Sequence, residues 1–127
     1  WRDSLLSVAG NLDETVGGPT FDLKDASIRR RTVYAKISRH DLNGLLRLFD
    51  FPDANVTADK RTETTVPQQQ LFALNSDFMT NQAKAFAERI AKVAPTDEER
   101  IAFAYRVAFC RAPTKREQEL ALTFVQA

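Results

Sequence analysis

The chain has 127 residues, which fits one folded domain with a single hydrophobic core. Its 18 basic and 17 acidic side chains nearly cancel, so we expect neither nucleic-acid binding nor attraction to an anionic membrane. With one cysteine and one histidine, the chain has no intrachain disulfide, and we expect it to hold no metal or cofactor of its own. No apolar run approaches the roughly 20 residues that span a bilayer.

Hydrophobic periodicity begins at the first residues, where a helix is expected from Arg2 to Leu12. Gly17-Gly18-Pro19 interrupts the pattern, because Gly permits positive φ and Pro lacks an N–H donor. The period changes to two over residues 32–38, which predicts a short extended segment, with residues 21–23 as its possible pairing partner.

The middle of the chain predicts two helices joined by a polar connector. Asp41 is the expected N-cap of the first, which Pro52 ends, and residues 53–63 form the connector. Pro67 suits the first turn of the second helix, where its missing N–H leaves nothing unsatisfied. That helix is expected to break near Asn75, restart with Ser76 as a new cap, and continue to about residue 94.

Two capping boxes organise the last third, with Thr96 and Thr114 as N-caps followed three residues later by Glu. The linker between the two helices is short, so they are expected to form an antiparallel hairpin. The predicted fold is mainly α: a compact bundle of five or six helices, one domain over residues 1–127. Because both ends lie inside helical patterns, we expect this domain to have been excised from a longer multidomain protein.

Residues 64–75 form an uncharged block in a chain whose residues are 28% charged. This block begins like a helix but has amides where a solvated helix usually has Lys and Glu. We therefore expect it to lie against something, either in this domain or in a partner.

The candidates for chemistry are few. His40 and Cys110 are each the single residue of their kind, and both are more typical of helix-end positions than of catalytic groups. Asp50 and Asp53 could form an acid/base pair, although a solvated loop is the commoner interpretation. The run 29–31 is entirely Arg and could bind an anion or pair with nearby carboxylates.

Several blocks in order resemble one family. They are Arg2-Asp3 with Leu5-Leu6, Gly17-Gly18-Pro19, Arg30-Arg31-Thr32-Val33-Tyr34, Leu48-Phe49-Asp50-Phe51-Pro52-Asp53, residues 61–75 (RTETTVPQQQLFALN), and residues 105–114 (YRVAFCRAPT). Together they resemble the C-terminal domain of unknown function 1553 of large planctomycete proteins. Cys110 departs from the pattern, because the family usually has Gly there, and Gly suits a left-handed helix C-cap.

This resemblance implies a domain near the end of a long exported protein, and so an extracytoplasmic location. It also implies that a cytochrome-c-like haem domain is often present elsewhere in the same polypeptide. It supplies no catalytic residues.

The polar residues of these blocks are the candidate site: Arg31, Asp50, Arg61, Thr64, Thr65, Gln68 and Asn75. They could form a buried hydrogen-bond network that fixes the connector to the helix after it. They could equally line a cleft.

Two functions remain open from the sequence. The first is a non-catalytic helical accessory module that contacts other domains of its polypeptide or a protein partner. The second is a component of a polysaccharide-active or haem-linked redox enzyme, adding one wall of a composite site. In the second, Arg30, Arg31 and Arg61 would bind anionic groups and Asp50 and Asp53 would supply acid/base function. A cleft where Asp50, Arg61 and His40 converge would favour it.

Overall fold

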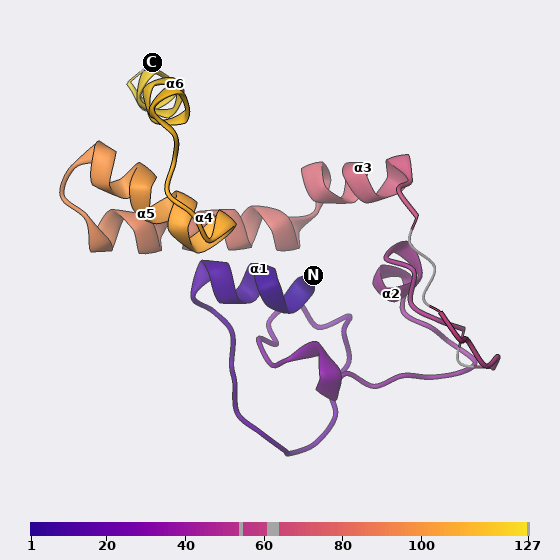
Figure 1. The fold of residues 1–127 in the computed structure, drawn as a ribbon. Helices are drawn as coiled ribbons and strands as arrows, with labels where there is room; N and C mark the ends of the chain where they lie inside the picture. The colour runs from indigo at the N-terminus through magenta and orange to yellow at the C-terminus, as the bar shows by residue number, and fades with distance from the viewer. Residues whose placement is uncertain (54, 61–63, 127) are drawn as a thin grey trace. The chain divides into compact units, whose positions relative to one another are not determined.

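The computed structural model describes residues 1–53, 55–60 and 64–126, and these are mainly α-helical, as the sequence predicts. Within them, strand pairing is limited to two isolated parallel bridges, Asp13 with Arg30 and Phe21 with Ala35. The elements in chain order are α1 (Arg2–Ala9), the 3-10 turn η1 (Thr32–Tyr34), α2 (Gly44–Leu48), α3 (Pro67–Asn75), α4 (Asp77–Val93), α5 (Asp97–Phe109) and α6 (Lys115–Val125) (Figure 1).

The contacts divide the chain into two compact units. The terminal unit combines Trp1–Asn11 with Gln82–Ala127, and the inserted unit is Leu12–Asn81. The single domain over residues 1–127 stays a prediction.

In the terminal unit, α1 is held on α4 by a long-range arginine contact. The helix predicted to reach Leu12 ends three residues earlier, at Ala9, because Gly10 adopts the left-handed conformation at φ 77°. Arg89 Nη1 donates to the carbonyls of Ser7 (3.0 Å) and Val8 (2.7 Å), so a cation lies at the negative, C-terminal end of the helix. Leu6 of the same helix is 1% exposed, the most deeply buried position of the described chain.

The last two helices begin where the sequence predicts. Thr96 accepts a hydrogen bond from Glu99 N at 3.4 Å, and Thr114 forms a complete capping box with Glu117. Helices α5 and α6 pack together, yet Figure 1 shows α6 almost end-on while α5 lies across the view. Their crossing is therefore steeper than the antiparallel hairpin expected from the short linker.

The inserted unit departs from the sequence expectation at residues 32–38. Instead of continuing as a strand, Thr32–Tyr34 form a 3-10 turn, because the N–H groups of Tyr34 and Ala35 bond locally to Arg31 and Thr32 carbonyls. These N–H groups are therefore occupied before a strand partner could use them. The extended part begins at Ala35, and its bridge partner is Phe21, as the pairing expectation proposed.

Helix α2 also differs from the prediction. Its N-cap is Asn43 rather than Asp41, with Asn43 Oδ1 accepting from Leu45 N at 2.9 Å. Four residues before Pro52, the helix ends at Leu48, because Phe51 N turns back to bond Leu46 O at 2.9 Å. The predicted break after Asn75 is present, and Ser76 Oγ accepts from Met79 N at 3.2 Å as the new cap.

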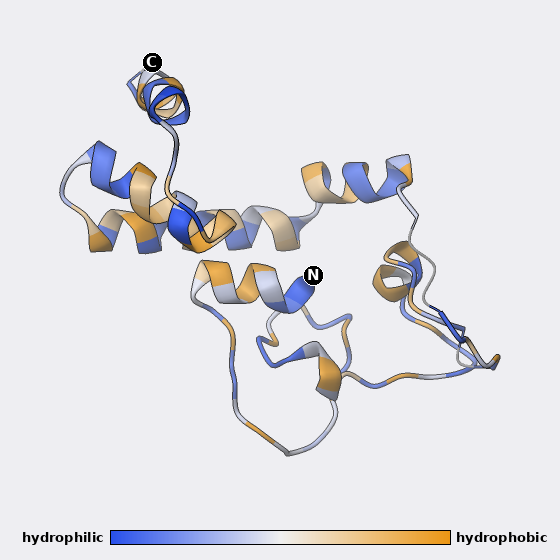
Figure 2. Cartoon of the chain, viewed as in Figure 1, coloured by the Kyte–Doolittle hydropathy of each residue, from blue (hydrophilic) through white to orange (hydrophobic). Residues whose placement is uncertain are grey.

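The chain leaves unusually much surface open. It exposes 9386 Å². One globular protein of 14.3 kDa would expose about 6,800 Å², and two equal globular halves about 8,200 Å². Figure 2 shows hydrophobic stretches recurring along the helices, yet Leu74 is 79% exposed and Phe124 84%. Large apolar side chains are thus exposed in both units.

Candidate functional site

Asp50, one of the candidate site residues predicted from the sequence, fixes the connector between α2 and α3. Asp50 accepts from Thr64 N at 2.8 Å and from Thr64 Oγ1 at 2.7 Å. Asp50 has φ 55°, a left-handed conformation that Asp tolerates better than most side chains. The structure therefore brings two predicted site residues together across 14 positions of sequence.

Gln69 makes the second tie and was not among the predicted residues. Its Nε2 donates to Leu48 O at 2.9 Å, and its Oε1 accepts from Val66 N at 3.4 Å. One amide thus pairs with a carbonyl at the end of α2 and an N–H at the start of α3, both groups that helix termini leave unsatisfied. The signal was available, because Gln at the third position after an N-cap is half of a capping box.

The remaining predicted residues do not join this contact. Thr65 and Gln68 are exposed at the start of α3, and Asn75 Nδ2 bonds back to Leu71 O within its own helix at 3.0 Å. Arg31 is exposed and caps η1 through its carbonyl. Arg61 lies outside the described residues.

The Gly-Gly-Pro loop is held by an arginine from the 29–31 run. Arg30 donates from Nη1 to Pro19 O at 2.6 Å and from Nη2 to Gly17 O, while its guanidinium lies 4.6 Å from the Tyr34 ring centroid. The Tyr34 hydroxyl accepts from Gly17 N at 3.0 Å. Arg30 therefore uses its donors on backbone carbonyls of its own chain.

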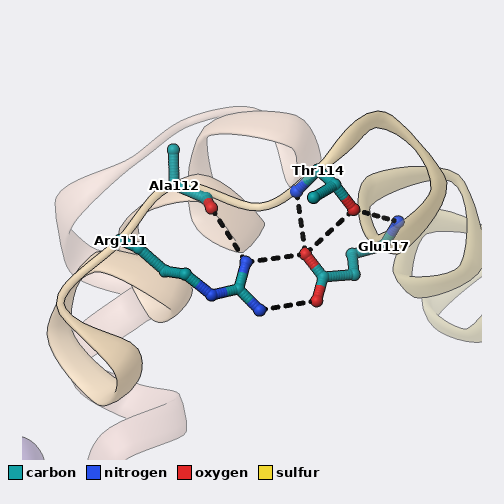
Figure 3. Close-up of polar contacts among 4 residues, drawn as sticks. All are labelled: Arg111, Ala112, Thr114 and Glu117. Carbon is teal, nitrogen blue, oxygen red and sulfur yellow. Dashed lines mark hydrogen bonds and ion pairs between the residues drawn. The ribbon is translucent and has the colours of Figure 1, made fainter.

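A second arginine organises the turn between α5 and α6, drawn in Figure 3. Arg111 forms a bidentate pair with Glu117, at 2.8 and 2.7 Å, and also donates to Ala112 O at 3.1 Å. Glu117 Oε2 accepts from Thr114 N at 2.8 Å, which completes the capping box. These hydrogen bonds lower the pKa of Glu117 from 4.5 to about 2, and the bond from Arg111 has the largest effect.

The residue before this arginine is Cys110, where the family resemblance implies glycine. Cys110 lies at φ 56° in the left-handed region, so the helix ends with the backbone geometry that a glycine would adopt. A non-glycine side chain there is sterically strained. The thiol is exposed.

One hollow of about 550 Å³ lies in the inserted unit, between the start of α2 and the turns that follow that helix. Asp50 and Asp53 line it, and His40 is not among its described lining residues. The convergence of Asp50, Arg61 and His40 that would favour an enzyme is therefore not seen among the described residues. The described chain also has no group of three His, Cys, Asp or Glu side chains placed to hold a metal ion.

Comparison with known proteins gives one match. The family model described as "PSD1: Protein of unknown function (DUF1553)" matches residues 1–125. No curated protein and no solved structure matches the chain. Among the described helices, none is long and apolar enough to cross a membrane.

Proposed function

Since this chain belongs to the PSD1 family of proteins of unknown function (DUF1553), we propose from its own residues that it is a non-catalytic helical accessory module. It docks, in this proposal, onto another domain of the same polypeptide. That polypeptide is proposed to be a large exported planctomycete protein, in line with the family resemblance.

The use of the motif residues supports a structural rather than a catalytic role. Arg30 binds the carbonyls of a loop, Asp50 binds a connector threonine, and Arg111 pairs with a capping glutamate. Each of these groups satisfies the chain's own backbone or a helix cap. A catalytic group, in contrast, must present its reactive atom to a substrate.

Helix α3 supplies the proposed docking surface. Gln69 and Phe72 face the end of α2, where Phe72 packs edge-on against Phe49 with ring centroids 5.9 Å apart. The opposite side leaves Leu71 and Leu74 exposed, and no residue of α3 is charged. We define this α3 face as Gln68, Gln70, Leu71 and Leu74, all of which are exposed.

An uncharged face of this kind suits a protein surface better than bulk water. The cores of protein interfaces are depleted in charged residues, and leucine burial contributes favourably to association. The single observation that carries the proposal is the exposure of Leu74 on a helix without charges.

The test places a charge on the α3 face of the intact polypeptide. Leu74→Lys is expected to weaken docking about tenfold or more, as for a buried apolar contact replaced by a charge. Docking is measured by limited proteolysis between domains and by cross-linking within the polypeptide. Asn81→Lys, at an exposed position on α4, is the matched control and is expected to leave docking unchanged. Equal behaviour of the two variants would refute the proposal.

The alternative proposal is a wall of a composite active site in a polysaccharide-active or haem-linked redox enzyme. Its support is the hollow that Asp50 and Asp53 both line. Under this alternative, Asp53→Asn in the intact polypeptide reduces turnover while the domains stay docked. Under the accessory-module proposal, the same substitution leaves turnover unchanged.

A further inference from the structure

The hollow of the inserted unit has two different kinds of wall. Its apolar side comprises Leu42, Phe51, Pro52, Val56 and Ala58. Its volume, about 550 Å³, lies within the range of small-molecule sites. Such a hollow has room for a ligand with a compact apolar body.

Three cations line the same hollow: Arg39, Arg47 and Lys60. The charged group of none of them makes an ion pair or hydrogen bond with a residue that the structure describes. This contrasts with Arg30, Arg89 and Arg111, whose guanidinium groups are all engaged by their own chain.

The two carboxylates of the hollow differ from its cations, because both accept hydrogen bonds within the chain. Both oxygens of Asp50 accept from Thr64, and Asp53 Oδ1 accepts from Asn55 N at 2.9 Å and from Asn55 Nδ2 at 3.1 Å. Their lone pairs are thus partly occupied within the chain, while the charged groups of the three cations have no partner among the residues that the structure describes. The described lining residues also carry a net positive formal charge, with three cations against two carboxylates.

We propose that this hollow binds a small organic oxyanion, a phosphate or sulfate ester whose anionic group meets Arg39, Arg47 and Lys60 and whose apolar body contacts Phe51 and Val56. Guanidinium groups recognise tetrahedral oxyanions through paired, charge-assisted hydrogen bonds. The neighbouring apolar wall adds affinity for the ester over the free ion. The site is separate from the α3 face and does not depend on the docking role proposed for it.

The experiment titrates phenyl phosphate and phenyl sulfate into the chain and follows backbone amide shifts of residues 38–60 by NMR. Both esters are expected to move these signals, and inorganic phosphate is expected to bind about tenfold more weakly because it lacks the apolar group. Equal affinity for phenyl phosphate and inorganic phosphate would overturn the apolar half of the proposal. If neither ester shifts these signals, the whole proposal is overturned.

Matched charge removals distinguish a site from general attraction to cations. Arg47→Gln and, separately, Lys60→Gln are each expected to weaken phenyl phosphate binding about tenfold, the loss of one charge-assisted hydrogen bond. Arg116→Gln removes the same charge from an exposed position on α6 and is expected to leave affinity unchanged. A native-like amide spectrum of each variant establishes that it is folded. An equal loss in all three variants would show non-specific attraction and refute the site.

Discussion

The two units of this chain are stabilised in different ways. In the terminal unit, regular helices bury Leu6, Ala9, Ala94 and Ile101, and the long-range contacts join helix to helix. In the inserted unit, the described buried hydrophobic residues are Phe21 and Ala35, and much of the backbone is fixed by side-chain hydrogen bonds to turns. The hydrophobic pattern of the sequence therefore predicts the structure of the terminal unit well and that of the inserted unit poorly.

The largest effect is expected from the core of the terminal unit. Leu6→Ala removes a side chain that is 1% exposed and leaves a cavity, so the free energy of unfolding is expected to fall by about 2–5 kcal/mol. Urea denaturation followed by circular dichroism measures it. Leu74→Ala makes the same change at an exposed position and is expected to cost less than about 0.5 kcal/mol. Similar costs for both would show that α1 is not packed as described.

A smaller effect is expected in the inserted unit. Asp50→Ala removes both hydrogen bonds to Thr64 and should destabilise the connector by about 1–2 kcal/mol. Amide hydrogen exchange is the informative measurement, because protection should fall for Thr64 and the start of α3 and hold in α5. Asp59→Ala, an exposed acidic position on the same connector, is the control. Loss of protection in α5 as well would mean that the two units unfold together.

The turn between α5 and α6 should be sensitive to acid. Because its pKa falls to about 2 in the folded chain, Glu117 contributes stability that is complete above its ordinary value of 4.5. This contribution is lost as pH falls from about 5 toward 2. Unfolding free energies measured across this range should fall less steeply in Glu117→Gln than in the wild type, whereas Glu119→Gln should match the wild type. Identical slopes in all three chains would contradict the Arg111–Glu117 pair.

The smallest effect is expected at the helix end before Arg111. Cys110→Gly should stabilise the chain by about 0.5–1 kcal/mol, because glycine adopts the left-handed conformation without steric cost but is more flexible when unfolded. Thermal unfolding would register this as a rise in Tm. Cys110→Ala retains Cβ and should show no gain. A gain in the alanine variant would point to the thiol rather than the backbone.

The features that the sequence predicted correctly are those set by residues close to one another in the chain. The caps at Thr96, Thr114 and Ser76 and the helix start at Pro67 depend on neighbours within three or four positions, and all four are present. Alternation at 32–38 was a poor guide because local N–H bonds close a 3-10 turn there.

Among the candidate site residues, the pairing of Asp50 with Thr64 needed the three-dimensional path of the connector. The composition could not distinguish a carboxylate that bonds a threonine 14 residues away from one that faces solvent. The same applies to Arg30: the sequence suggested an anion or nearby carboxylates as its partners, whereas it binds the backbone carbonyls of a nearby loop.

The contact of Arg89 with the end of α1 has a consequence for biosynthesis. The carbonyls of Ser7 and Val8 are synthesised 82 and 81 positions before their guanidinium partner. At ordinary translation speed that interval lasts on the order of 4 to 16 seconds, and the inserted unit is synthesised within it. Helix α1 is thus expected to wait as an unpartnered amphipathic segment, available to chaperones, until Arg89 has been synthesised.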